Sequence, residues 1–275
     1  MKRSVPLTAA LSVAAVVSAL VLMAASSLAA SSLPTLTLSV TKNTITVGGS
    51  KVSGAVNVVS TVTGEKNDSP GLVLLKPGVT LAQFGQAVAA IGNGPLDAID
   101  PYATIVFDGY TNEGTPTTDQ VVLQPGTYVA LNNGNGHAVF TVTNAANPAA
   151  LPKPAATVTA IDFAFRGAST LREGELVRFE NDGYLIHMVV FAPVKSVADA
   201  KKAETLLLAG KAKEALSKYG TGPQGMFAGP LSHGAMQQQV ISQPPGVYVI
   251  ACAMNAEDGR DHYQLGMFRT IRIVK

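Results

Sequence analysis

Apolar and polar residues alternate along much of the chain, and this pattern of period two predicts β-strands. Because successive side chains of a strand point to opposite faces of a sheet, an alternating segment buries one face and exposes the other. β-Branched and aromatic residues, which favour strands, are common in these segments. The predicted strands are 35–41, 103–107, 138–142, 157–165, 175–179 and 268–274.

Turn sequences separate the predicted strands. Val47 is followed by two glycines, and residues 124–126 and 181–183 read Gln-Pro-Gly and Asn-Asp-Gly. Glycine, proline and asparagine adopt turn conformations at low cost. Many short strands divided by such turns favour an all-β fold built from antiparallel sandwiches.

Two stretches, 80–90 and 197–219, have helical spacing instead. In the second stretch, small and apolar residues recur three or four positions apart among lysines and glutamates: Ala203, Leu206, Leu207, Ala212, Ala215 and Leu216. This spacing places them on one face of a helix. We therefore expect each half of the chain to carry a short helical insertion.

The two halves of the chain also resemble each other in sequence. Residues 124–132 are similar to 244–252, and in both segments a Pro-Gly turn leads into an alternating strand. Residues 72–77 are similar to 188–193, and a stretch of helical character follows each. Two tandem copies of one structural unit explain this self-similarity economically.

A segment of prolines and small residues at 144–155 separates the two halves. It has neither helical nor strand periodicity, and such a composition is typical of a semi-rigid spacer. The sequence therefore predicts one domain at 31–143, a linker at 144–155 and a second domain at 156–275.

The first residues read as a secretory signal peptide at 1–29. Lys2 and Arg3 precede a largely apolar stretch, and small residues end at Ala29, the expected cleavage site. No other apolar run approaches spanning length, so we expect no membrane span after cleavage; retention of the signal as an anchor is the alternative. The predicted location is secreted or extracytoplasmic, which includes the cell envelope and the periplasm.

The charge balance argues against nucleic acid as a partner. The chain has 20 lysines and arginines against 18 aspartates and glutamates. Signal cleavage removes Lys2 and Arg3 and no acid, which leaves equal numbers of the two signs. A protein without a basic excess has little with which to neutralise phosphates.

Cys252 is the only cysteine of the chain. In an exported protein, a lone cysteine is buried, paired with another chain, free or bound to a metal. Only the last role also uses its neighbours, because His262 and Met267 follow Cys252 and His187 precedes it. Two imidazoles and a thiolate in a plane, with a weak axial thioether, are the ligands of a blue-copper centre.

The second half resembles the cupredoxins, the superfamily of plastocyanin and azurin. The similarity includes residues 177–181, the segment 246–252 that ends at the cysteine, and the order His, Cys, His, Met. It implies a Greek-key β-sandwich and one copper ion, of type 1 or type-1-like, held by four ligands. Carried over residue by residue, these ligands are His187, Cys252, His262 and Met267.

The spacing Cys-x9-His is longer than the cupredoxin pattern. The additional residues, 254–260, are mostly polar. They either project outward and leave the ligands together, or hold His262 away from the metal, or admit water and give a more tetragonal copper site. The first half lacks the ligand set, since Asn132 and Gly71 take the places of the cysteine and the first histidine, and only His137 remains. We expect it to bind no type 1 copper.

These observations predict a secreted protein that binds one copper ion for electron transfer or copper handling, with an unidentified redox or copper-exchange partner. The alternative is a metal-free cupredoxin-like module that binds an extracellular component. Enzyme activity is not expected. Multicopper oxidases share the fold but need His-x-His pairs, which the sequence lacks, and Cys252 ends a predicted strand instead of beginning a helix that would lower its pKa.

Overall fold

The computed structural model describes residues 33–275, apart from residues 93 and 135. The predicted signal peptide lies outside these residues. The first half of the described chain contains these elements: β1 (Thr35–Thr41), β2 (Thr44–Gly49), β3 (Gly54–Val62), β4 (Asn67–Asp68), β5 (Gly71–Leu75), α1 (Leu81–Ile91), η1 (Leu96–Ile99), β6 (Ala103–Asp108), β7 (Thr111–Asn112), β8 (Thr117–Leu123), β9 (Gly126–Leu131) and β10 (His137–Val142).

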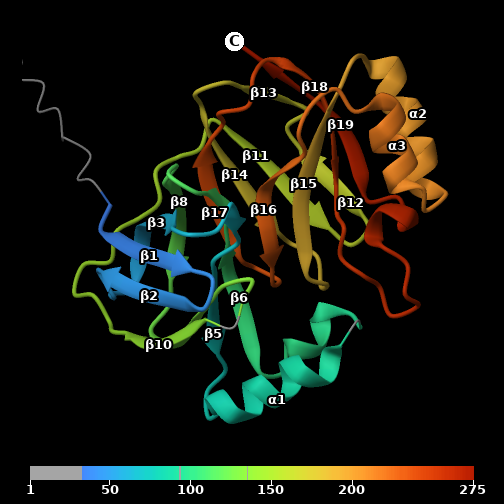
Figure 1. Ribbon diagram of the computed structural model, residues 1–275. Coiled ribbons are helices and arrows are strands. Elements are labelled where there is room, and N and C mark those ends of the chain that lie inside the picture. Colours follow the sequence, from blue (N-terminus) through green and yellow to red (C-terminus); the bar gives the residue numbers. More distant parts are fainter. Residues whose placement is uncertain (1–32, 93, 135) are drawn as a thin grey trace, which may run out of the picture. The chain divides into compact units, whose positions relative to one another are not determined.

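The second half follows a stretch without a named element and contains these elements: β11 (Ala156–Ile161), β12 (Ala164–Gly167), β13 (Thr170–Arg172), β14 (Leu176–Asn181), β15 (His187–Val194), α2 (Val197–Leu208), α3 (Ala212–Tyr219), β16 (Gly225–Leu231), β17 (Met236–Val240), β18 (Gly246–Ala251), η2 (His262–Leu265) and β19 (Phe268–Val274). The prediction of a mostly β protein with a helical insertion in each half is confirmed (Figure 1).

Each half is a sandwich, and one sheet runs through both. The eight-stranded sheet has the order β12-β11-β14-β17-β8-β3-β1-β2, in which β17 of the second half pairs with β8 of the first. The four-stranded sheet β10-β9-β5-β6 completes the first sandwich, and the five-stranded sheet β13-β19-β18-β15-β16 completes the second. Residues 33–275 form one compact unit. The division into domains at 31–143 and 156–275 with a linker at 144–155 stays a prediction.

The alternating pattern determines which side chains form each core. In β1, Leu36, Leu38 and Val40 are buried while the residues between them face outward. They join the core of the first sandwich, whereas Phe179 and Ile250 belong to the core of the second. Burial of aliphatic and aromatic surface is the main favourable contribution to such a fold.

The two helical insertions cover different sheets. Helix α1 begins with a capping box, in which Thr80 and Gln83 satisfy each other's backbone N–H groups. The stretch 197–219 forms two helices, which are separated at Gly210, a residue with φ of 70°. The apolar faces of α2 and α3 pack on β15 and β18. Figure 1 shows both helices on the outer face of the five-stranded sheet.

One strand prediction differs from the structure in a way that matters for the site. The alternating stretch 157–165 is a hairpin instead of one strand, because the chain reverses at Asp162 and Phe163 between β11 and β12. Phe163 has φ of 61°, a left-handed conformation that costs a residue with a Cβ about 1–2 kcal/mol. The turn therefore stores backbone strain next to the predicted ligands.

Candidate metal centre

The predicted ligands lie at one end of the second sandwich. His187 is the first residue of β15, Cys252 directly follows β18, His262 begins η2 and Met267 directly precedes β19. Strands β15 and β18 are antiparallel neighbours, as are β18 and β19. The start of one strand therefore lies beside the end of the next, which brings residues far apart in sequence to the same edge.

Three of the four side chains form a compact triangle. The Nδ1 atoms of His187 and His262 are 3.2 Å apart, and the Sγ atom of Cys252 lies 3.7 Å from the first and 3.4 Å from the second. A point equidistant from three atoms with these separations lies about 2.0 Å from each, close to the lengths of metal–imidazole and metal–thiolate bonds. The donor atoms therefore fit a single metal ion.

The triangle is isolated from solvent. His187 is 1% exposed, and Cys252 and His262 are 0% exposed. Within residues 33–275, leaving aside 93 and 135, these three side chains are the one group of three or more His, Cys, Asp or Glu residues that could hold a metal ion. Buried polar donors of this kind require partners. A bound ion would satisfy all three at once.

The long segment between Cys252 and His262 projects outward and leaves the histidine in the cluster. Residues 257–260 are exposed. A bridge between Asn255 and Asp261 closes the base of this loop, and the N–H of His262 donates to the carbonyl of Met254 at 2.7 Å. Of the three arrangements left open by the sequence, the structure has the outward excursion.

The backbone of Met267 forms hydrogen bonds with two of the other predicted ligands. Its N–H donates to the carbonyl of His262, and its own carbonyl accepts from the N–H of Cys252, both at 3.0 Å. Its side chain is fully buried in the same apolar cluster as Cys252. The structure therefore places all four predicted residues close together, and backbone hydrogen bonds join the methionine to His262 and Cys252.

The environment keeps both imidazoles neutral. Burial lowers the pKa of His187 to about 4 and also lowers the pKa of His262. The Nε2 atom of His187 lies 3.2 Å from Oδ1 of Asp162. Donation of the Nε2 proton to this carboxylate leaves the Nδ1 lone pair directed at the triangle. Neutral imidazole is the form of histidine that binds metals.

The thiol of Cys252 needs a metal to ionise near neutral pH. Burial raises its pKa to about 12, and the N–H of Met188 donates to Sγ at 3.4 Å. A coordinating metal displaces the thiol proton, so binding at this site releases a proton. Two neutral imidazoles, one thiolate and an adjacent methionine are the donor set of a blue-copper centre.

Two residues of the β11–β12 turn support the histidines, and the sequence did not indicate either of them. Asp162 contacts His187, and the ring of Phe163 packs edge-on against His262, with ring centres 5.2 Å apart and planes at 89°. Both lie inside the stretch 157–165, where Asp162 takes a position that the alternation assigns to the buried face, in phase with Val158 and Ala160. Its polarity at the middle of an apolar strand is the one signal that would have indicated a turn.

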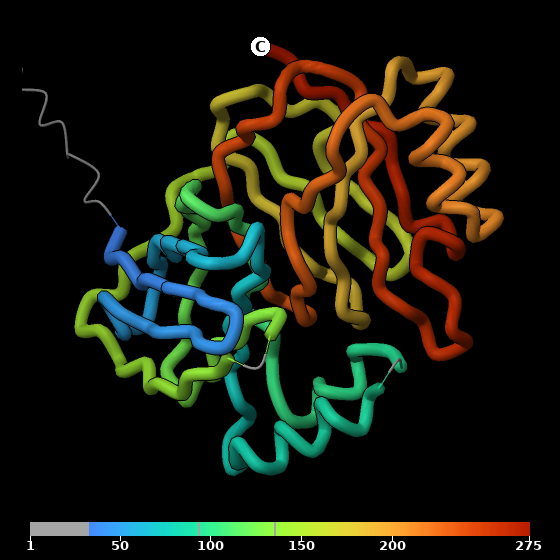
Figure 2. The backbone as a smooth tube through the Cα atoms, viewed as in Figure 1, coloured from blue at the N-terminus to red at the C-terminus, as the bar shows by residue number. Residues whose placement is uncertain are grey.

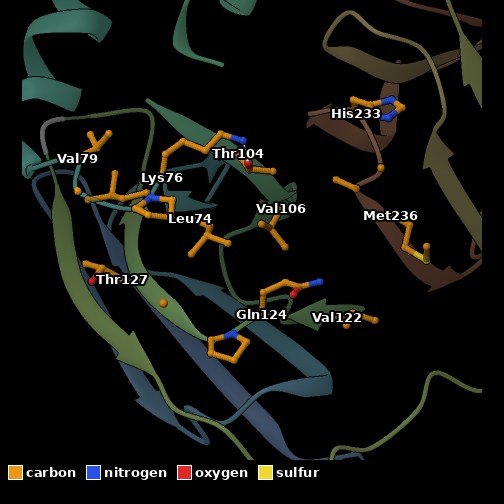
Figure 3. Close-up of a pocket in the computed structure, with 17 residues that line it drawn as sticks. Leu74, Lys76, Val79, Thr104, Val106, Val122, Gln124, Thr127, His233 and Met236 are labelled. Carbon is orange, nitrogen blue, oxygen red and sulfur yellow. Dashed lines mark hydrogen bonds between the residues drawn. The ribbon is translucent and has the colours of Figure 1, made fainter. Parts of the chain in front are cut away.

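A large cavity lies elsewhere in the described residues. It has a volume of about 740 Å³ and lies between strands of the first half and the loop at 233–236. His233 and Met236 lie across it from Leu74 and Lys76 (Figure 3), and Lys76 donates to Thr104. None of the four predicted ligands lines it. The cavity is therefore separate from the candidate metal centre.

No protein-family model matches the sequence, and no curated protein matches it. Among solved structures, auracyanin A, a "blue" copper protein of Chloroflexus aurantiacus, is 16% identical and covers 43% of this chain and 96% of its own, with a TM-score of 0.26. A multicopper oxidase of Pseudomonas thermotolerans is 11% identical and covers 87% of this chain and 67% of its own, with a TM-score of 0.24.

A copper-containing nitrite reductase of Thermus scotoductus is 10% identical and covers 88% of this chain and 68% of its own, with a TM-score of 0.25. The two sandwiches and the cluster of His187, Cys252 and His262 bear out the resemblance to cupredoxins.

The prediction that the chain is not an enzyme was wrong. Matched structures that cover most of the chain include a multicopper oxidase and a nitrite reductase, which are enzymes. Their identities of 11% or less assign no reaction to this protein. Within residues 33–275, apart from 93 and 135, no helix has the length and apolar character needed to cross a membrane.

Proposed function

We propose that His187, Cys252, His262 and Met267 bind one copper ion and that the protein uses this site for electron transfer. The observation that carries the proposal is the buried triangle of two Nδ1 atoms and one Sγ atom. Copper supplies a one-electron couple when it is bound to such a donor set. The three triangle atoms and the thioether of Met267 would hold the ion.

The residues around the site favour electron transfer over delivery of copper. All four proposed ligands are buried, and the backbone bonds of Met267 and Cys252 hold the ligand loop at both ends. An ion at such a site leaves slowly, because the loop must open before solvent or a receiving protein can reach the ligands. An electron needs no such opening.

We also propose that residues 1–29 direct export and that the protein works outside the cytoplasm with a redox partner. The support is the order of basic, apolar and small residues in this segment. In that location a thiol without a cysteine partner is exposed to oxidants unless it is buried or metal-bound, and Cys252 is fully buried.

The proposal is tested by metal analysis of the full chain. We expect the purified protein, after copper loading and desalting, to retain one copper per chain. His187→Ala and His262→Ala should retain much less, whereas His137→Ala, in the first half, should match the wild type. Equal copper retention in all four proteins would contradict the proposal.

A further inference from the structure

The first half of the chain, which has no ligand set, reaches the ligand-bearing segments of the second. Ile186 directly precedes His187 and is fully buried. Its side chain belongs to an apolar cluster whose other buried members all come from the first half: Val73, Leu75, Phe84, Ile99, Ala103, Ile105 and Val129. The residue next to the first proposed ligand is therefore anchored in the other sandwich.

A second contact fixes the backbone at the same position. Asp97 lies in η1, and its Oδ1 atom accepts a hydrogen bond from the N–H of Ile186. A hydrogen bond from a backbone N–H to a carboxylate is stronger than one between neutral groups. Because Ile186 is buried, its N–H would otherwise lack a partner, which is costly. Asp97 thus holds the backbone at Ile186, directly before His187, the first residue of β15.

The same cluster contacts the ligand loop on its other side. Met254, two residues after Cys252, packs against it, and the carbonyl of Met254 accepts from the N–H of His262. A cavity of about 600 Å³ lies between the segment 95–98 and the exposed part of the loop, and Asp97 and Phe163 line it. Figure 2 shows this loop approaching the segment that follows α1.

We infer that the first half forms one wall of the metal centre and that Asp97 is a positioning residue for His187. The inference rests on the proposed function. It explains how a half without the ligand set still contributes to the site. Its contacts converge on Ile186, which precedes His187, and on Met254, which lies two residues after Cys252 and accepts a hydrogen bond from His262. Loss of the acceptor at position 97 leaves the N–H of Ile186 without a partner and loosens the start of β15, where His187 lies.

The test compares three variants of the full chain. Asp97→Ala removes the acceptor, while Asp97→Asn keeps an oxygen that can accept the same hydrogen bond. Asp258→Ala is the matched control, because Asp258 lines the same cavity and carries the same charge but pairs with Arg260. Copper affinity, the copper EPR spectrum and hydrogen exchange of the Ile186 amide in the metal-free protein are measured for each.

We expect Asp97→Ala to speed exchange of the Ile186 amide and to weaken Cu(II) binding, each by about tenfold or more, from the loss of a charge-assisted hydrogen bond. Its EPR spectrum should shift, whereas Asp97→Asn and Asp258→Ala should stay close to wild type in all three measurements.

Unchanged exchange at Ile186 in Asp97→Ala would overturn the inference, and so would an equal loss of copper affinity in Asp97→Ala and Asp258→Ala, which would indicate a general charge effect. The exchange measurement needs no copper. A wild-type protein that binds no copper would therefore refute the proposed function and the inference that the first half lines a metal centre. Faster exchange in Asp97→Ala would still show that Asp97 anchors the backbone of Ile186.

Discussion

Asp162 Oδ1 lies 3.2 Å from Nε2 of His187, on the side of the imidazole opposite the nitrogen that faces Cys252 and His262. The same oxygen accepts from the N–H of Leu185 at 3.1 Å. A Cβ atom at Gly183 would lie within 3 Å of both Asp162 and His187, so glycine permits this close approach. Carboxylates in this position orient a metal-binding histidine and increase its basicity.

The first prediction concerns this carboxylate. We expect Asp162→Ala to weaken copper binding by about 10–100-fold, the range found when such outer partners are removed. Asp162→Asn keeps an acceptor oxygen and should lose less. Affinity is measured by competition with a chelator, and Asp182→Ala, an exposed acid in the 181–186 loop, serves as the control. Equal affinities for Asp162→Ala and the control would show that Asp162 does not support the site.

The second prediction concerns the pH dependence of copper binding. Burial raises the pKa of Cys252 to about 12 and lowers the pKa values of His187 and His262. Between pH 7 and 9 the metal-free site is therefore a protonated thiol with two neutral imidazoles, and binding releases one proton. Affinity, corrected for the chelator, should rise about tenfold per pH unit. A flat profile over this range would mean that the thiolate is already formed or is not a ligand.

The third prediction concerns Asp119, a buried acid of the first sandwich. Burial raises its pKa from 3.8 to about 7. A carboxyl group whose pKa is higher in the folded than in the unfolded state stabilises the folded protein below pH 3.8. This stabilisation is lost as the pH rises through 7. Asp119→Asn has no such loss.

The free energy of unfolding of Asp119→Asn relative to wild type should therefore increase between pH 4 and 7, by up to about 4 kcal/mol. Urea unfolding of the metal-free proteins at several pH values measures this difference, with the exposed Asp182→Asn as the control. A difference that does not change with pH would show that Asp119 titrates normally in the folded protein.

The fourth prediction separates the axial from the equatorial ligands. Met267→Leu should leave copper bound and raise its reduction potential, because a thioether is a weak axial donor whose loss destabilises Cu(II). The buried site accepts leucine, which is similar in volume. His262→Ala should weaken binding sharply. Voltammetry and copper titration measure the two effects, and an unchanged potential in Met267→Leu would remove the methionine from the proposed ligand set.

Much of the fold and the close grouping of the proposed ligands could be predicted from local sequence. The alternation at 35–41 matches β1 residue for residue, because one face of that strand is buried and the other is exposed. The proposed ligands could be identified because Cys252, His262 and Met267 lie close together in sequence, with Cys252 and Met267 next to the ends of two neighbouring strands and His262 between them. These signals depend on the period of a strand and on spacing along the chain.

The supporting contacts could not be predicted in the same way. Asp162 interrupts the apolar face of an alternating stretch, which is a local signal of the turn at 162–163, but its contact with His187, 25 residues away, has no such signal. The contact of Asp97 with Ile186 and the pairing of β8 with β17 join segments about 90 or more residues apart. Such contacts depend on how the two sandwiches pack, which local patterns do not specify.

Addition of Cu(II) to the metal-free protein, followed by visible absorption spectroscopy, tests the central claim most directly. A copper ion bound by the Cys252 thiolate between His187 and His262 should give a strong thiolate-to-copper charge-transfer band that reaches its maximum at one copper per chain. Cys252→Ser should abolish the band. A wild-type protein that binds copper at full occupancy and remains colourless, or that binds none, would contradict the account.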